Sequence, residues 1–236
     1  EAKKLFVDAK EMLDDIITHK KLKAKAVLGI YEAHEENGDV VLPSEGKKFN
    51  FLRQQRKMGN GIPNLSLADY IAPKSTGKKD YLGAFAVTAG IGIEKMVEQY
   101  EADHDDYNSI MVKALADRLA EAFTECLHHE VRTGIWGYTA DEQLTNDELI
   151  REKYQGIRPA AGYPASPDHT EKATLWDLLE VENNTGISLT DSFAMYPAAS
   201  VSGLYFSHPQ SKYFAVGKIS NDQVENYAER KEADLK

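Results

Sequence analysis

Tyr81-Leu82-Gly83-Ala84-Phe85-Ala86-Val87-Thr88 is a run of aromatic, β-branched and small apolar residues with glycine on each side, which predicts a buried β-strand. Two antiparallel hairpins are predicted elsewhere in the chain, one on either side of this run. They join residues 26–31 to 39–42 through an Asn37-Gly38 turn signal, and residues 200–206 to 213–219 across His208-Pro209-Gln210.

Helices are predicted where apolar residues recur every three or four positions or where a capping pattern occurs. These segments are residues 3–17, residues 93–131 with a break near 103–106, residues 146–154 ending at Gly156, a helix from Asp168 with Glu171 closing a capping box, and a helix start at Ser220 with Gln223. Helices and hairpins mix without a regular β-α-β alternation. We therefore expect the α+β class: a single compact domain over residues 1–236, with a mainly antiparallel sheet and flanking helices.

Composition excludes several classes of protein. The 236 residues include 28 Lys and Arg against 38 Asp and Glu, a formal charge of −10, which argues against a nucleic-acid or membrane-surface partner. No apolar run approaches the roughly 20 residues of a membrane span. Cys126 is the only cysteine, so there is no internal disulfide or multi-cysteine zinc site, which suits a cytoplasmic location. The chain begins at Glu1, and we expect it to be a piece of a longer enzyme.

One loop combines rigid backbone with reactive side chains. Residues 156–172 are dense in glycine and proline, yet they contain Arg158, Tyr163, His169 and Glu171 just before a predicted helix. Such a loop can present backbone N–H groups and an arginine to a carboxylate. By composition alone it is equally compatible with a structural crossover.

Other motifs are weaker. Gly90-Ile91-Gly92 follows a strand but lacks the later glycine of a phosphate-binding loop. His128 and His129 are adjacent on a helix and point in different directions, so no metal ligand is assigned to them. A metal-dependent hydrolase remains a minor alternative; its ligands would be His104, Asp105, Asp106 and Glu121.

The amino-acid sequences of several stretches resemble the C-terminal activation domain of cobalamin-dependent methionine synthase. The similarity runs in family order from about residue 65 to the end of the chain, and is looser before it. The matching stretches are Leu67–Lys74, Tyr81–Thr88, His104–Asn108, Arg158–Lys172, Ala199–Gly203, Tyr205–Pro209 and Asp222–Glu225.

This resemblance implies a set of functional residues. The expected S-adenosylmethionine-binding residues are Asp69, Arg158, Ala160, Tyr163, Tyr213 and Phe214, the last at a position where a second tyrosine is common in the family. Glu121 and Glu152 are the implied catalytic acids. An acid, an arginine and aromatic rings suit a ligand with an ammonium group, a carboxylate and a sulfonium.

The resemblance also implies a function. The domain would bind S-adenosylmethionine and donate its methyl group during reductive reactivation of the synthase. Cobalamin would be held by another domain, so the isolated chain would not perform the full methyltransferase reaction. Flavodoxin or a flavoprotein reductase would supply the electron, and Lys74, Lys78 and Lys79 are candidates for docking an acidic donor. The alternative is a non-catalytic module that binds S-adenosylmethionine or docks on a corrinoid protein.

Overall fold

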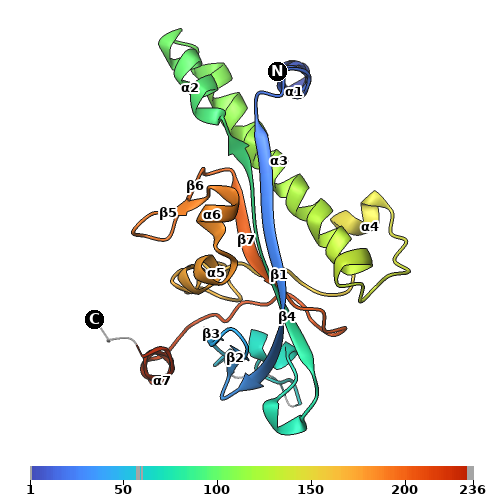
Figure 1. The fold of residues 1–236 in the computed structure, drawn as a ribbon, viewed down its shortest axis with the longest axis vertical. Coiled ribbons are helices and arrows are strands. Elements are labelled where there is room, and N and C mark those ends of the chain that lie inside the picture. Colours follow the sequence, from blue (N-terminus) through green and yellow to red (C-terminus); the bar gives the residue numbers. More distant parts are fainter. Residues whose placement is uncertain (1, 57–58, 60, 233–236) are drawn as a thin grey trace. The chain divides into compact units, whose positions relative to one another are not determined.

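Figure 1 shows the computed structural model, which describes residues 2–56, 59 and 61–232. One sheet has five strands in the order β3-β2-β1-β4-β7, and a second pairs β5 with β6. The strands are β1 Lys23–Glu36, β2 Asp39–Leu42, β3 Lys47–Asn50, β4 Asp80–Ile91, β5 Ser188–Leu189, β6 Met195–Tyr196 and β7 Ser200–Tyr205. The helices are α1 Ala2–Thr18, α2 Ile93–Ala102, α3 Asp106–Glu130, α4 Asn146–Ile150, α5 Glu171–Leu179, α6 Val181–Thr185 and α7 Asn221–Lys231.

The predicted α+β class is confirmed, and so is the predicted strand at residues 81–88. That strand lies within β4, which pairs with β1 on one side and β7 on the other (Figure 1) and is buried from Leu82 to Gly90. The first predicted hairpin is also confirmed: β1 and β2 are antiparallel, and Asn37 and Gly38 form their turn with φ of +56° and +86°. A third strand, β3, extends this hairpin with antiparallel pairing.

The chain divides into two compact units, to which β1, β4 and β7 each contribute residues. The first unit contains residues 2–27, 86–128 and 181–201. Its core includes Met12 and Ile16 of α1 packed with Met111 and Val112 of α3. Burying an apolar side chain of this size contributes roughly 1.5–3 kcal/mol. The predicted break in the long helix is confirmed, since α2 ends at Ala102 and α3 begins at Asp106.

The second unit contains the described parts of residues 28–85, 129–180 and 202–232. Its core includes Phe85 of β4, whose ring is stacked on that of Tyr205 with a centroid distance of 4.5 Å. Gly203 allows β7 to approach Pro159 closely, because a Cβ there would lie 2.7 Å from the Pro159 carbonyl oxygen. The unit contains the glycine- and proline-rich loop, residues 156–170, called the 156–170 loop below.

Some predicted elements were wrong. Residues 213–219 form no strand; the Val216 N–H instead donates to the Pro164 carbonyl at 2.8 Å, which joins this segment to the 156–170 loop. The helix predicted from Asp168 begins three residues later, because the Asp168 carboxylate accepts hydrogen bonds from the N–H and hydroxyl of Thr170.

Two helix ends also differ from the prediction. Ser220 does precede α7, but the Gln223 side chain bonds the backbone N–H and carbonyl of Arg53 instead of closing a capping box. α4 ends at Ile150, four residues before the predicted end. Among the described residues, no helix has both the length and the apolar composition needed to cross a membrane.

Candidate functional site

The 156–170 loop begins beside the end of β7. Ile157 and Phe206 exchange two backbone hydrogen bonds of 3.0 Å each. The Pro159 carbonyl accepts a third, also 3.0 Å long, from the Leu204 N–H. These bonds fix the backbone on both sides of residue 158.

Further along, the loop folds into a tight turn. The Gly162 N–H donates to the Ser166 carbonyl at 2.7 Å, and the Ser166 N–H donates to the Tyr163 carbonyl at 2.9 Å. Gly162 has φ of +94°, and a Cβ there would lie 2.2 Å from the His169 ring. The Ala160 carbonyl accepts from the Tyr163 N–H at 3.4 Å. The turn leaves the Tyr163 side chain 64% exposed.

Arg158 makes the contacts that join this loop to its surroundings. Its backbone N–H donates to the Tyr213 hydroxyl at 3.0 Å, and its guanidinium Nη1 donates to the Tyr154 hydroxyl at 2.8 Å. Tyr213 is 41% exposed, and the neighbouring Phe214 is half-buried. The structure thus brings together the predicted arginine and the first residue of the predicted aromatic pair.

Asp69 lies in a 3-10 helical turn, Leu67–Tyr70. Its two carboxylate oxygens accept hydrogen bonds of 2.6 Å from the two terminal nitrogens of Arg53, and one also accepts from the Ser66 N–H at 2.9 Å. The nearby carboxylate raises the pKa of Arg53 above its ordinary value. Asp69 remains 35% exposed at its side chain, so it is oriented but accessible.

Tyr70 connects the surroundings of Asp69 to those of Arg158. Its hydroxyl donates to the Lys212 carbonyl at 3.3 Å and accepts from the Lys212 N–H at 3.4 Å, one residue before Tyr213. An open groove of about 700 Å³, a volume in the range of small-molecule sites, lies beside Asp69. It is lined by Arg53, Pro63, Asn64, Leu65, Asp69, Tyr70, His208, Gln210 and Lys212.

The sequence analysis did not predict a buried ion pair, Arg132–Glu142, that lies near Arg158. Arg132, in a π-helical turn after α3, is fully buried and forks the Glu142 carboxylate at 2.9 and 2.7 Å. Hydrogen bonding from Arg132 lowers the pKa of Glu142, and burial raises the pKa of the nearby Tyr138 hydroxyl. No amphipathic pattern predicts a buried arginine, because its partner lies ten residues away in an irregular segment.

Glu121 and Glu152, the two predicted acids, belong to different units of the chain. Glu152 lies just after α4 in the second unit, with φ of +52° and an exposed side chain. Glu121 is exposed on α3 and belongs to the first unit.

The hydrolase alternative receives no support from the geometry. Asp105 accepts hydrogen bonds from the backbone and side-chain nitrogens of Asn108, which is the role of a helix cap. Glu121 lies 15 residues beyond Asp106 on the same helix, roughly 22 Å away at 1.5 Å per residue, too far to share an ion. Within the described part of the chain, no three His, Cys, Asp or Glu side chains are grouped as a cation site requires.

Gly90, Gly92 and the adjacent histidines have structural placements. Gly92 precedes α2 with φ of +98°, and a Cβ at Gly90 would lie 2.9 Å from the Pro197 ring, so both glycines serve backbone geometry. His128 is fully buried whereas the His129 side chain is 43% exposed, which confirms that they point in different directions.

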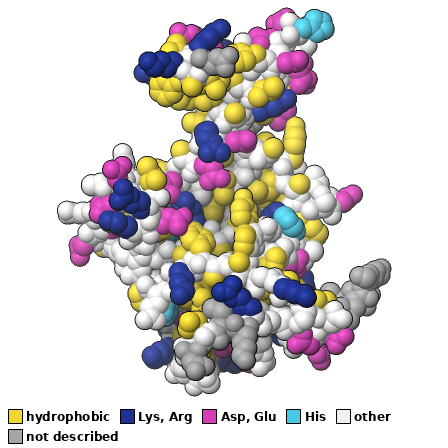
Figure 2. Space-filling model, turned by 180° about the vertical axis from the view of Figure 1, so that it is seen from behind, with side chains coloured by type: hydrophobic (Ala, Val, Ile, Leu, Met, Phe, Trp, Pro, Cys, Tyr) yellow, Lys and Arg dark blue, Asp and Glu magenta, His cyan; other side chains and the backbone are white. Residues whose placement is uncertain are grey.

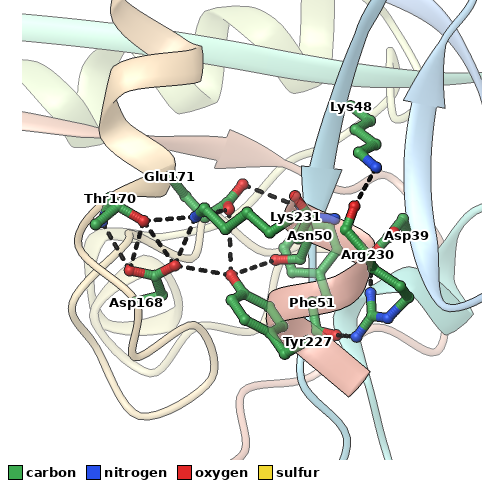
Figure 3. Close-up of polar contacts among 10 residues, drawn as sticks. All are labelled: Asp39, Lys48, Asn50, Phe51, Asp168, Thr170, Glu171, Tyr227, Arg230 and Lys231. Carbon is green, nitrogen blue, oxygen red and sulfur yellow. Dashed lines mark hydrogen bonds and ion pairs between the residues drawn. The ribbon is translucent and has the colours of Figure 1, made fainter. Parts of the chain in front are cut away.

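The far end of the 156–170 loop is held by α7 (Figure 3). Tyr227 and Lys231 point from this helix toward Asp168 and Glu171, and the Lys231 ammonium lies 2.6 Å from the Asp168 carboxylate. Arg230 points to the other side of the helix and pairs with Asp39. Burial raises the pKa of Glu171 even though Lys231 opposes the shift. The cluster of Tyr227, Lys231, Asp168 and Glu171, called the α7 clamp below, fixes the segment that leads into α5.

With this geometry in view, comparison with known proteins identifies the family. Residues 1–232 match the family described as vitamin B12 dependent methionine synthase, activation domain. A solved structure described as the MetH reactivation domain bound to AdoHcy superposes with a TM-score of 0.95 and is 55% identical in sequence. The similarity covers 99% of this chain and 74% of that one. The chain therefore belongs to the family of activation domains of vitamin B12 dependent methionine synthase, a methyltransferase family.

Proposed function

We propose that this domain binds S-adenosylmethionine and donates its methyl group to cobalamin during reactivation of methionine synthase. The observation that carries the proposal is the similar structure, 55% identical, which is bound to AdoHcy. AdoHcy, S-adenosylhomocysteine, is what S-adenosylmethionine becomes once its methyl group has left. A domain that holds both molecules is suited to present the methyl group and then release the product.

The residues of the second unit fit such a ligand. Arg158 is fixed at its backbone by Tyr213 and at its guanidinium by Tyr154, so it can offer nitrogen donors to the ligand's carboxylate. Asp69 stands at the open groove and can accept hydrogen bonds from an ammonium or hydroxyl group. Tyr163 and Tyr213 are exposed aromatic residues that can contact the adenine or the sulfonium.

For methyl transfer, the main requirement on the protein is to align the methyl group with its acceptor. The sulfonium already activates the methyl group, so the domain has to hold the methyl carbon toward its acceptor and exclude competing water. Cobalamin, held by another domain, would supply a strongly nucleophilic reduced cobalt. Because both reactants would already be activated, the main task of the domain is to bind and align them.

Calorimetric titration with S-adenosylmethionine and S-adenosylhomocysteine tests the proposal. Wild-type binding should be saturable, and Asp69→Ala and Arg158→Ala should each weaken it about tenfold or more, the loss expected when a charge-assisted hydrogen bond is removed. Arg151→Ala, at an exposed arginine at the end of α4, is the matched control and should bind as wild type. Absence of binding to the folded wild-type chain would refute the assignment.

Methyl transfer needs its own test. With the cobalamin-binding domain and a chemical reductant added, label from S-adenosylmethionine carrying a radioactive methyl group should appear on the corrinoid. We propose Glu121 and Glu152 as acids that assist this step, so Glu121→Gln and Glu152→Gln should slow transfer and leave ligand affinity unchanged. Ligand binding without any transfer would favour a non-catalytic binding or docking module.

The electron donor is also part of the proposal. An acidic flavodoxin or flavoprotein reductase would dock on Lys74, Lys78 and Lys79, although Lys74 is 2.8 Å from Glu36 and Lys79 is 3.8 Å from Glu32. Figure 2 shows basic and acidic side chains interspersed over the face in view. Charge reversal at the three lysines should slow reductive reactivation, with Lys218→Glu as the control. An unchanged rate would exclude this docking surface.

A further inference from the structure

Tyr154 occupies a position between two arginines. It is only 7% exposed, its hydroxyl accepts a 2.8 Å hydrogen bond from Arg158 Nη1, and the guanidinium carbon of Arg158 lies 5.8 Å from its ring centroid. The guanidinium carbon of Arg132 lies over the same ring at 4.1 Å from the centroid. The ring thus rests on a buried cation while its hydroxyl holds the guanidinium assigned to the ligand's carboxylate.

The cation beneath the ring is itself rigidly held. Arg132 has no exposed surface, and its Nε and Nη2 donate to the two oxygens of Glu142, whose side chain is 5% exposed. Its backbone carbonyl accepts from the Thr139 N–H at 2.9 Å, which closes the segment between the two partners. Because hydrogen bonding from Arg132 lowers the pKa of Glu142, the carboxylate is ionised at neutral pH and offsets the charge of Arg132.

A buried ion pair is a poor source of net stability, because desolvating both charges offsets their attraction. It is well suited to fixing geometry. A free arginine side chain loses about 2 kcal/mol of rotamer entropy when it is immobilised, so an arginine already held in place binds a carboxylate more tightly. The Arg132–Glu142 pair and Tyr154 supply such a support for Arg158.

We propose that Tyr154 is a positioning residue for the Arg158 guanidinium and that the Arg132–Glu142 pair fixes the Tyr154 ring. This inference rests on the proposed function, in which Arg158 binds the carboxylate of the ligand. Tyr154 would then tune affinity for the amino-acid part of the ligand specifically, and it would leave the adenosine part unaffected.

The test replaces only the hydroxyl. Tyr154→Phe keeps the ring over Arg132, and should weaken S-adenosylhomocysteine binding about tenfold or more by calorimetry, the effect of losing one hydrogen bond to a charged group. Binding of 5′-methylthioadenosine, which has no carboxylate, should not change when it is measured by competition. Tyr107→Phe, which removes an exposed hydrogen bond to Asp8, is the matched control and should leave both affinities unchanged.

A double-mutant cycle shows whether Tyr154 acts through Arg158. In an Arg158→Ala background, Tyr154→Phe should cause no further loss of S-adenosylhomocysteine affinity. Glu142→Gln, which loosens the pair from the other side, should reproduce the carboxylate-selective loss more weakly.

The outcomes separate this inference from the function on which it rests. An equal loss for both ligands in Tyr154→Phe, or a loss that persists without Arg158, would overturn the positioning role and leave S-adenosylmethionine binding intact. Failure of the wild-type chain to bind S-adenosylhomocysteine would overturn the proposed function and this inference together.

Discussion

Arg53 holds both carboxylate oxygens of Asp69 through its two terminal nitrogens, each at 2.6 Å. The geometry is that of a bidentate pair, but the side chains are 45% and 35% exposed, so water and salt screen their attraction. The pair therefore orients Asp69 at the groove more than it stabilises the fold. This distinguishes Asp69 from the buried charges of the same unit.

Asp69→Ala should consequently weaken ligand binding strongly and lower the free energy of unfolding only slightly. We expect its free energy of unfolding to fall by about 1 kcal/mol or less, since an exposed ion pair and one bond to the Ser66 N–H are lost. Ligand affinity should fall at least tenfold. Urea denaturation and calorimetry on the same preparation give the two quantities, and a stability loss above about 3 kcal/mol would make Asp69 a structural residue.

Arg132→Met, in contrast, should lower the free energy of unfolding strongly. It leaves the Glu142 carboxylate buried without its cation, which costs roughly 3–5 kcal/mol of unfolding free energy. The double variant Arg132→Met/Glu142→Met removes both charges and should recover most of that loss. Urea denaturation of the two single variants and the double variant measures the coupling, and strictly additive losses would contradict it.

The same pair predicts a dependence of stability on pH. The pKa of Glu142 is lowered in the folded protein, so its contribution is fully present above its unfolded pKa of about 4.5 and is lost as the pH falls through the lower folded value. The stability difference between wild type and Glu142→Gln should therefore be constant near neutral pH and shrink in acid. Glu229→Gln, at an exposed glutamate of α7, is the control; a difference that grows in acid would show the reverse shift.

Some elements and site residues were predictable from the sequence, and others were not. The β4 strand and the Asn37-Gly38 hairpin were predictable because local pattern and turn chemistry agree with the fold. Residues 213–219 have strand-like composition, but the Val216 N–H bonds the Pro164 carbonyl of the 156–170 loop instead of a neighbouring strand. Local sequence does not reveal such a tertiary contact. Arg158 and Asp69 are proposed as ligand-binding residues because of the resemblance to the family. Arg53, Tyr154 and the Arg132–Glu142 pair could not be predicted from the sequence, because their roles arise only from contacts made in the folded chain.

Removing the cation of the α7 clamp should destabilise the fold. Lys231→Met removes the cation shared by Asp168 and Glu171, and Glu171 is 4% exposed, so we expect a loss of about 2–3 kcal/mol of unfolding free energy. Asp168 and Glu171 raise the pKa of Lys231 against the opposing effect of burial, so this contribution is complete at neutral pH and fades only at strongly alkaline pH. Lys218→Met, at an exposed lysine, should change stability by less than about 0.5 kcal/mol; an equal effect of both variants would exclude the clamp.

Gly162→Ala tests whether the tight turn of the 156–170 loop shapes the ligand site. Its Cβ would lie 2.2 Å from the His169 ring, and φ of +94° is itself unfavourable for alanine, so the turn must rearrange and move Tyr163 and its neighbours. Gly77→Ala is the matched control, because Gly77 also has positive φ, +64°, but a Cβ there meets no atom of the described residues within 4 Å. Both variants should lose about 1–2 kcal/mol of stability from backbone strain. Only Gly162→Ala should also lose ligand affinity, and equal affinities in the two variants would show that the turn does not shape the site.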